Sequence, residues 1–374
     1  MSVVRGEARR RWSIVAACVL ALCLAPVAVA AWPTGMPPPV DPATLRDRIL
    51  ASTDQSYEGY VDTSGRLGLP PLPELAEVGG LLGGGTRIRT WHASATAWRV
   101  VELAATGERD TYRTASGTYR WDFERYLVTY VAGTQSVWLP GAADVVPPEL
   151  ARRLLAGGGW LSALPSRRVA GVAAVGLRLT PTDPDTSVGR VDIWADPASG
   201  LAVQVEISAR GGGDPVFASR FVQLRPVVPD PAVLVPAIPN GAGLATTTAE
   251  EVTGTLAAAL VGQLPATLTG RACASTGGLA GLSGVGTYGT GFGTIVVLTL
   301  PGRLGGRTLG AARDAGGTPV SFAGAQGYEL RASLLTSLVV RTEGDRASRR
   351  GWLLAGPVNP DVLRRAAAEL IGSR

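Results

Sequence analysis

The chain contains no lysine and only one histidine, His92, among its 374 residues. A phosphate-binding Walker A loop requires a lysine, and a metal site built on several histidines requires more than His92, so the sequence excludes both. A serine nucleophile paired with His92 would be expected in a GxSxG turn, and the sequence has none. We therefore expect His92 to be a hydrogen-bonded or exposed strand residue, and we predict no catalytic residue, no metal site and no cofactor.

Cysteine is also scarce, with three residues in the chain. Cys18 and Cys23 lie within an apolar N-terminal segment, which leaves Cys273 without a partner for an internal disulfide. Carboxylate pairs such as Asp183 and Asp185 lie in predicted turns, where they commonly accept hydrogen bonds from the backbone. A secreted hydrolase that uses carboxylates or the histidine stays open as an alternative, but the sequence favours a binding or regulatory protein over an enzyme.

Positive charge is concentrated at the N-terminus. The formal net charge is +5, and residues 1–30 hold four arginines and one glutamate, which leaves +2 for the rest of the chain. Short arginine groups elsewhere are scattered rather than clustered. A nucleic-acid-binding protein needs a concentrated basic surface, so we predict that nucleic acid is not a partner.

The first 30 residues read as a targeting segment. Three arginines at 9–11 precede an apolar run from Trp12 to Ala25, and an Ala-x-Ala sequence ends at Ala30. This order is typical of a secretory signal peptide cleaved after Ala30. Left uncut, residues 12–31 are about long enough to anchor the chain in a bilayer. Both alternatives place the body of the protein outside the cytoplasm, secreted or attached to the outer face of the cytoplasmic membrane.

Proline and glycine divide the remainder into domains. The chain has 49 glycines and 27 prolines, which favours short strands and many turns. We predict a proline-rich linker over 31–40, a first domain over 41–225, a second linker over 226–240 and a small α+β domain over 241–374.

The sequence contains start signals for three helices, and regular short strands are predicted in the segments between them. Asp41-Pro42, Pro147-Pro148 and Asn359-Pro360 each place a proline at the start of a helix, and these helices are predicted to end near Thr53, Leu155 and Ile371. Six short strands between Thr86 and Leu139, and four more between Arg167 and Leu224, predict a large antiparallel sheet or open barrel. One of these strands is predicted to run from Arg167 to Leu179, and a further helix from Ala249 to Leu260.

Two segments stand out within the first domain. In Val191–Ile207, apolar residues alternate on both sides of an Asp-Pro-Ala-Ser-Gly turn, which predicts a β-hairpin. Residues 64–85 are apolar but rich in glycine and proline, and a loop of this kind is unusual. We interpret it either as a loop packed on the core or as a lid that contacts a ligand or a membrane.

The hairpin and a strand predicted over residues 56–63 carry a family resemblance. The hairpin resembles that of the LolA-like fold, in which a W-x-D-x-x-x-G-L pattern joins two long strands; the matching residues are Trp194, Asp196, Gly200 and Leu201. "ASTDQSYEGYVDT" (51–63) and "WRVVELAATGERDTYRT" (98–114) resemble the beginning of the MucB/RseB family. The likeness covers residues 42–224.

The resemblance implies an α+β protein with a strongly curved antiparallel half-barrel closed by helices. Its concave face would be apolar and would hold lipid, acyl chains or lipoprotein, or the protein would bind a membrane-bound anti-sigma factor. We expect a regulator or sensor with such a partner and a lipid-like ligand; the alternative is a LolA-like carrier of lipid or lipoprotein without a signalling partner. The candidate cavity residues are Trp91, Trp98, Trp121, Phe123, Trp138 and Trp194.

Overall fold

A computed structural model of the chain describes residues 36–67, 76–103, 107–133, 141–251, 260, 262–274, 284–344 and 350–372. The segment from Pro38 to Arg374 forms one compact unit. The predicted targeting segment with its cleavage site at Ala30, the candidate cavity residue Trp138 and most of the predicted helix 249–260 lie outside the described residues. Among the described residues, no helix is both long and apolar enough to cross a membrane.

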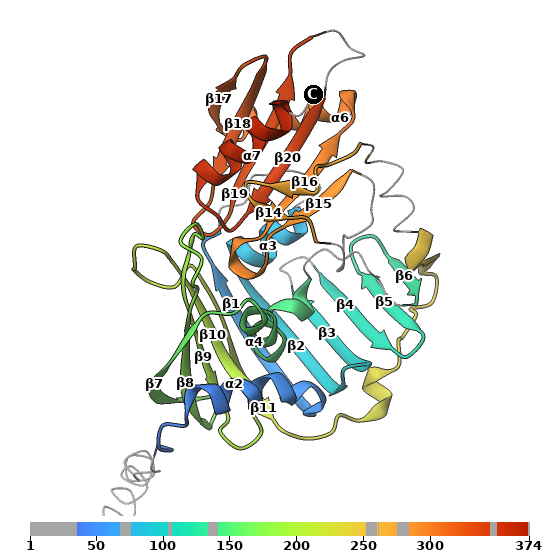
Figure 1. Cartoon of the computed structure of the whole chain (residues 1–374). Coiled ribbons are helices and arrows are strands. Elements are labelled where there is room, and N and C mark those ends of the chain that lie inside the picture. The colour runs from blue at the N-terminus through green and yellow to red at the C-terminus, as the bar shows by residue number, and fades with distance from the viewer. Residues whose placement is uncertain are drawn as a thin grey trace, which may run out of the picture. The chain divides into compact units, whose positions relative to one another are not determined.

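A twelve-stranded sheet makes up the first part of this unit (Figure 1). In spatial order its strands are β12 (Gly243–Thr248), β6 (Leu127–Ala132), β5 (Gly117–Asp122), β4 (Glu108–Thr114), β3 (Ala97–Leu103), β2 (Gly85–Ser94), β1 (Tyr57–Gly65), β11 (Phe217–Arg225), β10 (Ala202–Ala209), β9 (Val188–Ala195), β8 (Val172–Thr180) and β7 (Trp160–Val169).

This sheet is mixed, whereas the sequence predicted an antiparallel one. Strand β12 pairs with β6 in parallel, and the other strand pairs are antiparallel. The reason lies in the proline-rich segment 226–242, which leads from β11 in the middle of the sheet to the β6 edge (Figure 1). The chain therefore reaches that edge running in the same direction as β6.

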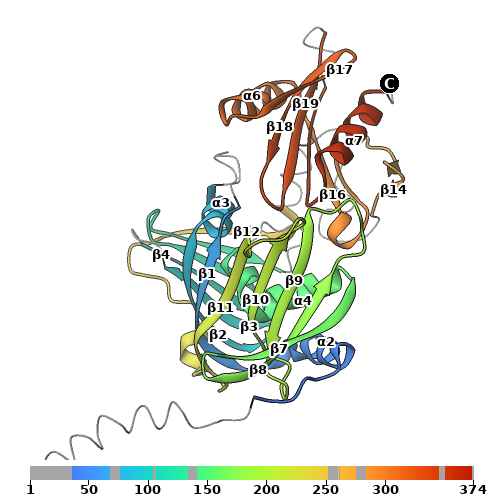
Figure 2. The same ribbon diagram turned by 90° about the vertical axis from the view of Figure 1, so that its left-hand side faces the viewer.

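A six-stranded antiparallel sheet makes up the second part. In spatial order its strands are β15 (Val285–Tyr288), β16 (Ile295–Leu300), β20 (Gly351–Gly356), β19 (Thr336–Thr342), β18 (Ala325–Arg331) and β17 (Thr318–Phe322), beside the short pair β13 (Thr267–Leu268) and β14 (Arg271–Ala272). Helices α6 (Gly302–Asp314) and α7 (Pro360–Gly372) cover opposite faces (Figure 2). Alternation along β19 explains this, because Val339 packs beneath α6 whereas Leu338 and Val340 pack beneath α7.

The remaining helices belong to the first sheet and its connections, except η5, which lies between β15 and β16 of the second sheet. They are α2 (Pro42–Ala51), η1 (Ser52–Asp54), α3 (Ala76–Gly83), η3 (Ala142–Val145), α4 (Pro147–Ala156), η4 (Pro231–Leu234) and η5 (Gly291–Gly293). The predicted start of α2 is confirmed, since the Asp41 carboxylate accepts a hydrogen bond of 2.9 Å from the backbone N–H of Thr44. The described part of the apolar segment 64–85 packs on the core, where Leu67 and Leu81 are buried.

One prediction of secondary structure was wrong, and one helix was not predicted. The single strand predicted from Arg167 to Leu179 is the end of β7 and most of β8, because Ala170 and Gly171 form a turn with φ of 48° and 85°. Helix α6 was not predicted at all. It contains four glycines, which lower helix propensity, yet Gly305 lets the helix approach Gly351 of β20 closely.

The main core lies between the large sheet and the helices α2 and α4. We call the sheet face that these helices cover the inner face. Leu45 and Ile49 of α2 and Ala151 and Leu155 of α4 are fully buried against it. The buried inner-face residues include Val61, Ile88, Leu177, Leu179, Val191, Ile193, Val205, Phe217 and Phe221.

Candidate binding site

The inner face of the sheet has two chemically different halves. The half formed by β7–β11, β1 and β2 is apolar and packed against α2 and α4, so its own helices fill it. The half formed by β3–β6 is polar and lines a hollow of about 280 Å³. We call this hollow the trough; its lining includes Glu102, Arg109, Thr111, Thr118, Arg120, Asp122, Arg125, Leu127, Thr129 and Val131. The apolar inner face expected from the sequence is therefore present in one half only.

Charges in the trough form a loose network. Arg109 lies 3.8 Å from Asp122 and 3.6 Å from Glu124, and Arg125 lies 3.8 Å from Asp122. The pairs of Arg109 with Glu124 and of Arg125 with Asp122 each include a side chain that is at least half exposed, so water weakens them. These side chains can exchange their present partners for those of another molecule at small cost. The trough is therefore suited to binding a polar, charged segment.

A second hollow, of about 250 Å³, lies at the border between the two halves of the inner face. It opens between β1–β4 and the segment formed by η3 and α4. We call it the His92 pocket; its lining includes Thr53, Tyr57, Thr90, His92, Trp98, Val100, Arg113, Ala143, Asp144, Val146, Glu149, Arg152 and Arg153. It adjoins the trough, since Arg113 and Thr111 follow each other on the same face of β4 and Ala143 follows Ala142.

The ring of His92 is held in one orientation. Its Nδ1 lies 3.1 Å from the carbonyl oxygen of Gln55. A carbonyl only accepts, so Nδ1 carries the proton and donates, and Nε2 of the neutral ring is a bare acceptor. The ring also stacks on Tyr57, with centroids 5.0 Å apart and planes 5° apart. The described residues supply no hydrogen-bond partner for Nε2 of His92.

Ion pairs fix one side of the His92 pocket. Glu149 accepts hydrogen bonds of 2.5 Å from Arg152 and 2.7 Å from Arg153. Arg153 also lies 2.7 Å from the carboxylate of Asp144. Because Glu149 binds both arginines, their guanidinium groups are held along one turn of α4 at the pocket.

His92 is expected to titrate below its ordinary pKa of 6.5, because burial lowers its pKa more than the hydrogen bond to Gln55 raises it. Arg152 lowers this pKa further, and the carboxylates of Asp54 and Glu149 raise it. The unfolded chain then binds a proton more readily than the folded chain. The contribution of neutral His92 to the free energy of unfolding should therefore be fully present above pH 6.5. It should be lost as the pH falls through the folded-state pKa.

Nuclear magnetic resonance of ¹⁵N-histidine protein reports this titration directly, since the chain has one histidine. A His92→Gln variant should lose the corresponding part of the acid dependence of the unfolding midpoint. A titration midpoint at or above 6.5 in the folded protein would contradict the prediction.

Of the candidate cavity residues that the structure describes, Trp98 lines the His92 pocket. Trp91 and Trp194 lie on the opposite face of the sheet, because each is one residue out of phase with the inner-face positions. Trp91 lies between Arg89 and Arg99, whose guanidinium carbons are 4.8 and 5.1 Å from its ring centroid.

The other candidate aromatic residues also lie away from the His92 pocket. The indole N–H of Trp194 donates to the carbonyl of Pro165, and Arg167 lies 3.4 Å above the ring. Trp121 is buried on the outer face against Tyr126, and Phe123 is 52% exposed in the β5–β6 turn. Of the candidate residues that the structure describes, Trp98 therefore lies in the His92 pocket, and Trp91, Trp121, Phe123 and Trp194 lie outside it.

The pocket residues that the sequence analysis missed are His92, Tyr57 and the α4 side chains. A signal for His92 was present, since strand alternation places it on the face opposite Trp91 and next to Trp98 of the neighbouring strand. No signal linked α4 to β1 and β2, which begin about 90 and about 60 residues earlier in the chain.

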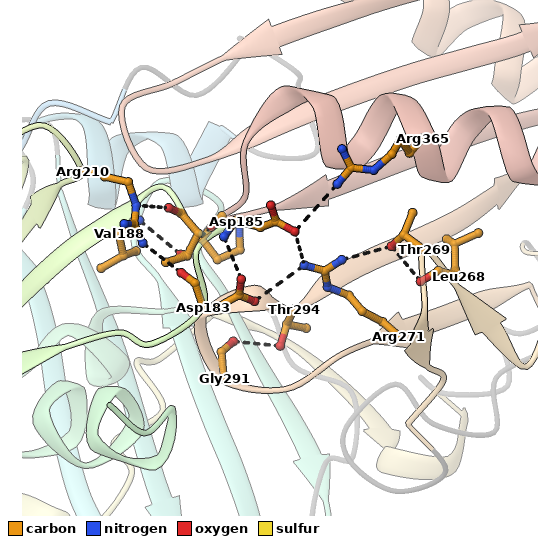
Figure 3. A network of polar contacts seen from close by, with 12 residues as sticks. Asp183, Asp185, Val188, Arg210, Leu268, Thr269, Arg271, Gly291, Thr294 and Arg365 are labelled. Atoms are coloured by element: carbon orange, nitrogen blue, oxygen red, sulfur yellow. Dashed lines mark hydrogen bonds and ion pairs between the residues drawn. The ribbon is translucent and has the colours of Figure 1, made fainter. Parts of the chain in front are cut away.

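A polar cluster joins the two sheets (Figure 3). Asp185, in the turn between β8 and β9, lies 3.0 Å from Arg271 of β14 and 3.8 Å from Arg365 of α7. Asp183 lies 3.6 Å from Arg271, and Arg210 donates to the Asp183 carbonyl at 2.9 Å. We call Asp183, Asp185, Arg271 and Arg365 the latch. The predicted turn role of Asp183 is also present, since its carboxylate accepts from the backbone N–H of Asp185 at 2.8 Å.

Glycines of η5 let the second sheet approach the first. A Cβ atom on Gly291 would overlap the carbonyl of Gly157, and one on Gly293 would overlap the carboxylate of Asp183. Between them, Phe292 is buried within the main core of the large sheet, as is Leu334. The two sheets therefore share apolar packing as well as the latch.

Known proteins resemble this chain in structure but not in sequence. No family model matches it, and no curated protein matches it. A structure of the Pseudomonas aeruginosa MucA/MucB complex matches with a TM-score of 0.50 and 17% identity, over 88% of this chain and 97% of that one. MucB in complex with MucA(peri) matches with a TM-score of 0.49 and 16% identity, over 87% of this chain and 97% of that one.

A third structure, the LolA superfamily protein NE2245 from Nitrosomonas europaea, matches with a TM-score of 0.26 and 10% identity, over 53% of this chain and 98% of that one. The match to the MucA/MucB complex, over 88% of this chain, includes residues of both sheets. The resemblance inferred from the sequence is confirmed: over most of its length the chain is structurally similar to MucB of the RseB family.

Proposed function

We propose that this protein is a non-enzymatic regulator outside the cytoplasm that binds the extracytoplasmic segment of a membrane-bound anti-sigma-type protein. The observation that carries the proposal is the likeness to MucB across both sheets, in a structure that contains MucA. A carrier of the LolA type would need the first sheet only. A likeness that includes the second sheet and its helices supports a function in which both parts take part.

The chemistry of the trough supports a protein segment as the occupant. Its floor presents arginine, carboxylate and threonine side chains from four neighbouring strands. An acyl chain laid over these groups would remove them from water without replacing their hydrogen bonds, which is unfavourable. A polypeptide supplies donors and acceptors of both signs, and charge complementarity would also speed its association.

A lipid or lipoprotein carrier without a signalling partner is the second candidate. The partly apolar His92 pocket favours it, since Trp98, Val100 and Val146 form part of its wall. The pocket volume of about 250 Å³ lies below the roughly 300–1,000 Å³ of typical ligand sites. This size argues for a small group rather than a full acyl chain, so we rank the carrier second.

The test is capture of the partner on the mature protein from detergent-solubilised membranes, with proteins and lipids both identified by mass spectrometry. Recovery of a single-span protein with a cytoplasmic sigma-binding domain supports the proposal. Recovery of lipid without such a protein overturns it in favour of the carrier.

Charge reversal in the trough provides a matched pair of variants. Arg120 is exposed on the inner face of β5, and Arg87 is exposed on the outer face of β2. We expect Arg120→Glu to weaken binding of the purified extracytoplasmic segment about tenfold or more at low salt, because it places a repulsive or unpaired charge at the interface. Arg87→Glu makes the same change of charge and should alter affinity less than about twofold. Equal effects of the two variants, measured by calorimetry, would place the binding site elsewhere.

A further inference from the structure

We propose that the His92 pocket receives one aromatic side chain with a hydrogen-bond donor, tryptophan or tyrosine, from the partner segment that occupies the trough. The inference rests on the proposed function and specifies how that partner is recognised. It follows from the shape of the pocket, its acceptor and its position beside the trough.

The wall of the pocket matches a flat apolar ring. The indole of Trp98 and the side chains of Val100, Ala143 and Val146 line it. An aromatic ring can pack edge-to-face or offset-stacked against an indole, and such pairs contribute beyond their buried area. With a volume of about 250 Å³, the pocket accommodates a side chain rather than a long acyl chain.

The pocket presents a fixed acceptor. His92 Nδ1 donates to Gln55, so the lone pair of Nε2 is available to a ligand. Stacking on Tyr57, which is itself buried, prevents the ring from rotating away. An incoming indole N–H or phenol O–H would satisfy Nε2, whereas a phenylalanine ring would bury it without a partner. Leaving a buried polar atom unpaired is unfavourable, so the acceptor selects for a donor.

Cations beside the pocket add to this selection. Arg113 of β4 and Arg152 of α4 both line it, and Arg152 is held by Glu149 at 2.5 Å. A guanidinium group close to an aromatic face attracts it through the ring quadrupole, most strongly for tryptophan. The pocket adjoins the trough along β4, so a segment lying in the trough can place one residue in the pocket without a break in the chain.

Indole titrated into the intact mature protein tests the proposal without any partner. The probe is the ¹⁵N resonance of Nε2 in histidine-labelled protein, which arises from His92 alone. We expect a saturable shift of Nε2 with indole. 1-Methylindole has the same ring without the N–H, and we expect it to bind about fivefold more weakly, since one hydrogen bond is lost.

Two variants and a control complete the test. Trp98→Ala should weaken indole binding at least fivefold, and Trp91→Ala, on the opposite face, should leave it unchanged. If Trp98→Ala does not fold, His92→Phe keeps an aromatic ring against Tyr57 and should abolish the preference for indole over 1-methylindole in calorimetry. The proposal is overturned by an unshifted Nε2 at saturating indole, or by equal affinities for the two indoles. Because the titration needs no partner, failed partner capture leaves this test intact.

Discussion

Gly291→Ala is expected to lower the free energy of unfolding by about 2–4 kcal/mol, a loss made of backbone strain and steric overlap. Gly291 has a φ of 58°, which residues with a Cβ rarely adopt, and its Cβ would overlap the carbonyl of Gly157. That carbonyl is backbone, so it cannot rotate away as a flexible side chain would. Relief requires η5 to withdraw from the large sheet, which would carry Phe292 out of the core. The change is measured by denaturant unfolding and by the rate of proteolysis between the sheets.

Two control substitutions separate strain from overlap. Gly270 has a φ of 72° and open space around its Cβ position, so Gly270→Ala should show the strain alone, about 1–2 kcal/mol. Gly310 lies in α6 with no atom near its Cβ position, so Gly310→Ala should stabilise the protein by about 0.5–1 kcal/mol. An effect of Gly291→Ala no larger than that of Gly270→Ala would show that the approach to Gly157 is not tight.

Arg364→Met is expected to destabilise the second sheet by about 2–3 kcal/mol, because it removes a partner from a buried carboxylate. The side chain of Glu329 is fully buried, and its two oxygens accept hydrogen bonds of 2.8 and 3.3 Å from Arg364. Arg331 also binds Glu329, but it donates to one carboxylate oxygen only and its side chain is 56% exposed, so the other oxygen loses its donor in the variant. Methionine keeps an unbranched apolar stem like the methylene part of arginine while removing the charge and the donors.

The matched control is Arg313→Met in α6. Arg313 pairs with Asp314 at 3.0 Å, but both side chains are more than 60% exposed. Exposed pairs contribute about 0–1 kcal/mol, so the free energy of unfolding of this variant should be close to that of the wild type. Adding Glu329→Gln to Arg364→Met should recover part of the loss, since no buried charge is then left. A double variant less stable than Arg364→Met would refute the explanation.

Local signals predicted the helix starts and the central hairpin. Proline after a capping residue correctly predicted the start of α2 at Pro42. The carboxylate of Asp41 accepts a hydrogen bond from an N–H that the first helical turn leaves free. In the hairpin, Gly200 has a φ of 73° and Asp196 accepts from Ser199 in the turn. The structure adds a second reason for glycine at this position, which the sequence does not show. A Cβ on Gly200 would also overlap the carbonyl of Arg48 in α2.

Features that depend on distant partners were not predictable in this way. The four glycines of α6 argue against a helix until its close packing on β20 is known. The polar trough was missed because alternation in β3–β6 indicates two faces but not which one the helices leave uncovered. His92 was predicted to be a hydrogen-bonded or exposed strand residue, but its place in a pocket was not, since its orientation depends on the Gln55 carbonyl and the Tyr57 ring rather than on a motif.

The position of Phe292 and Leu334 has a consequence for how the molecule is made. Both side chains complete the core of a sheet whose last strand, β12, ends at Thr248. During synthesis, the first sheet must therefore wait for some 90 further residues before Phe292 and Leu334 can join its core. Until then, the core residues that these two side chains cover stay accessible to water. The two sheets should consequently reach their final folded state together, in a single cooperative step.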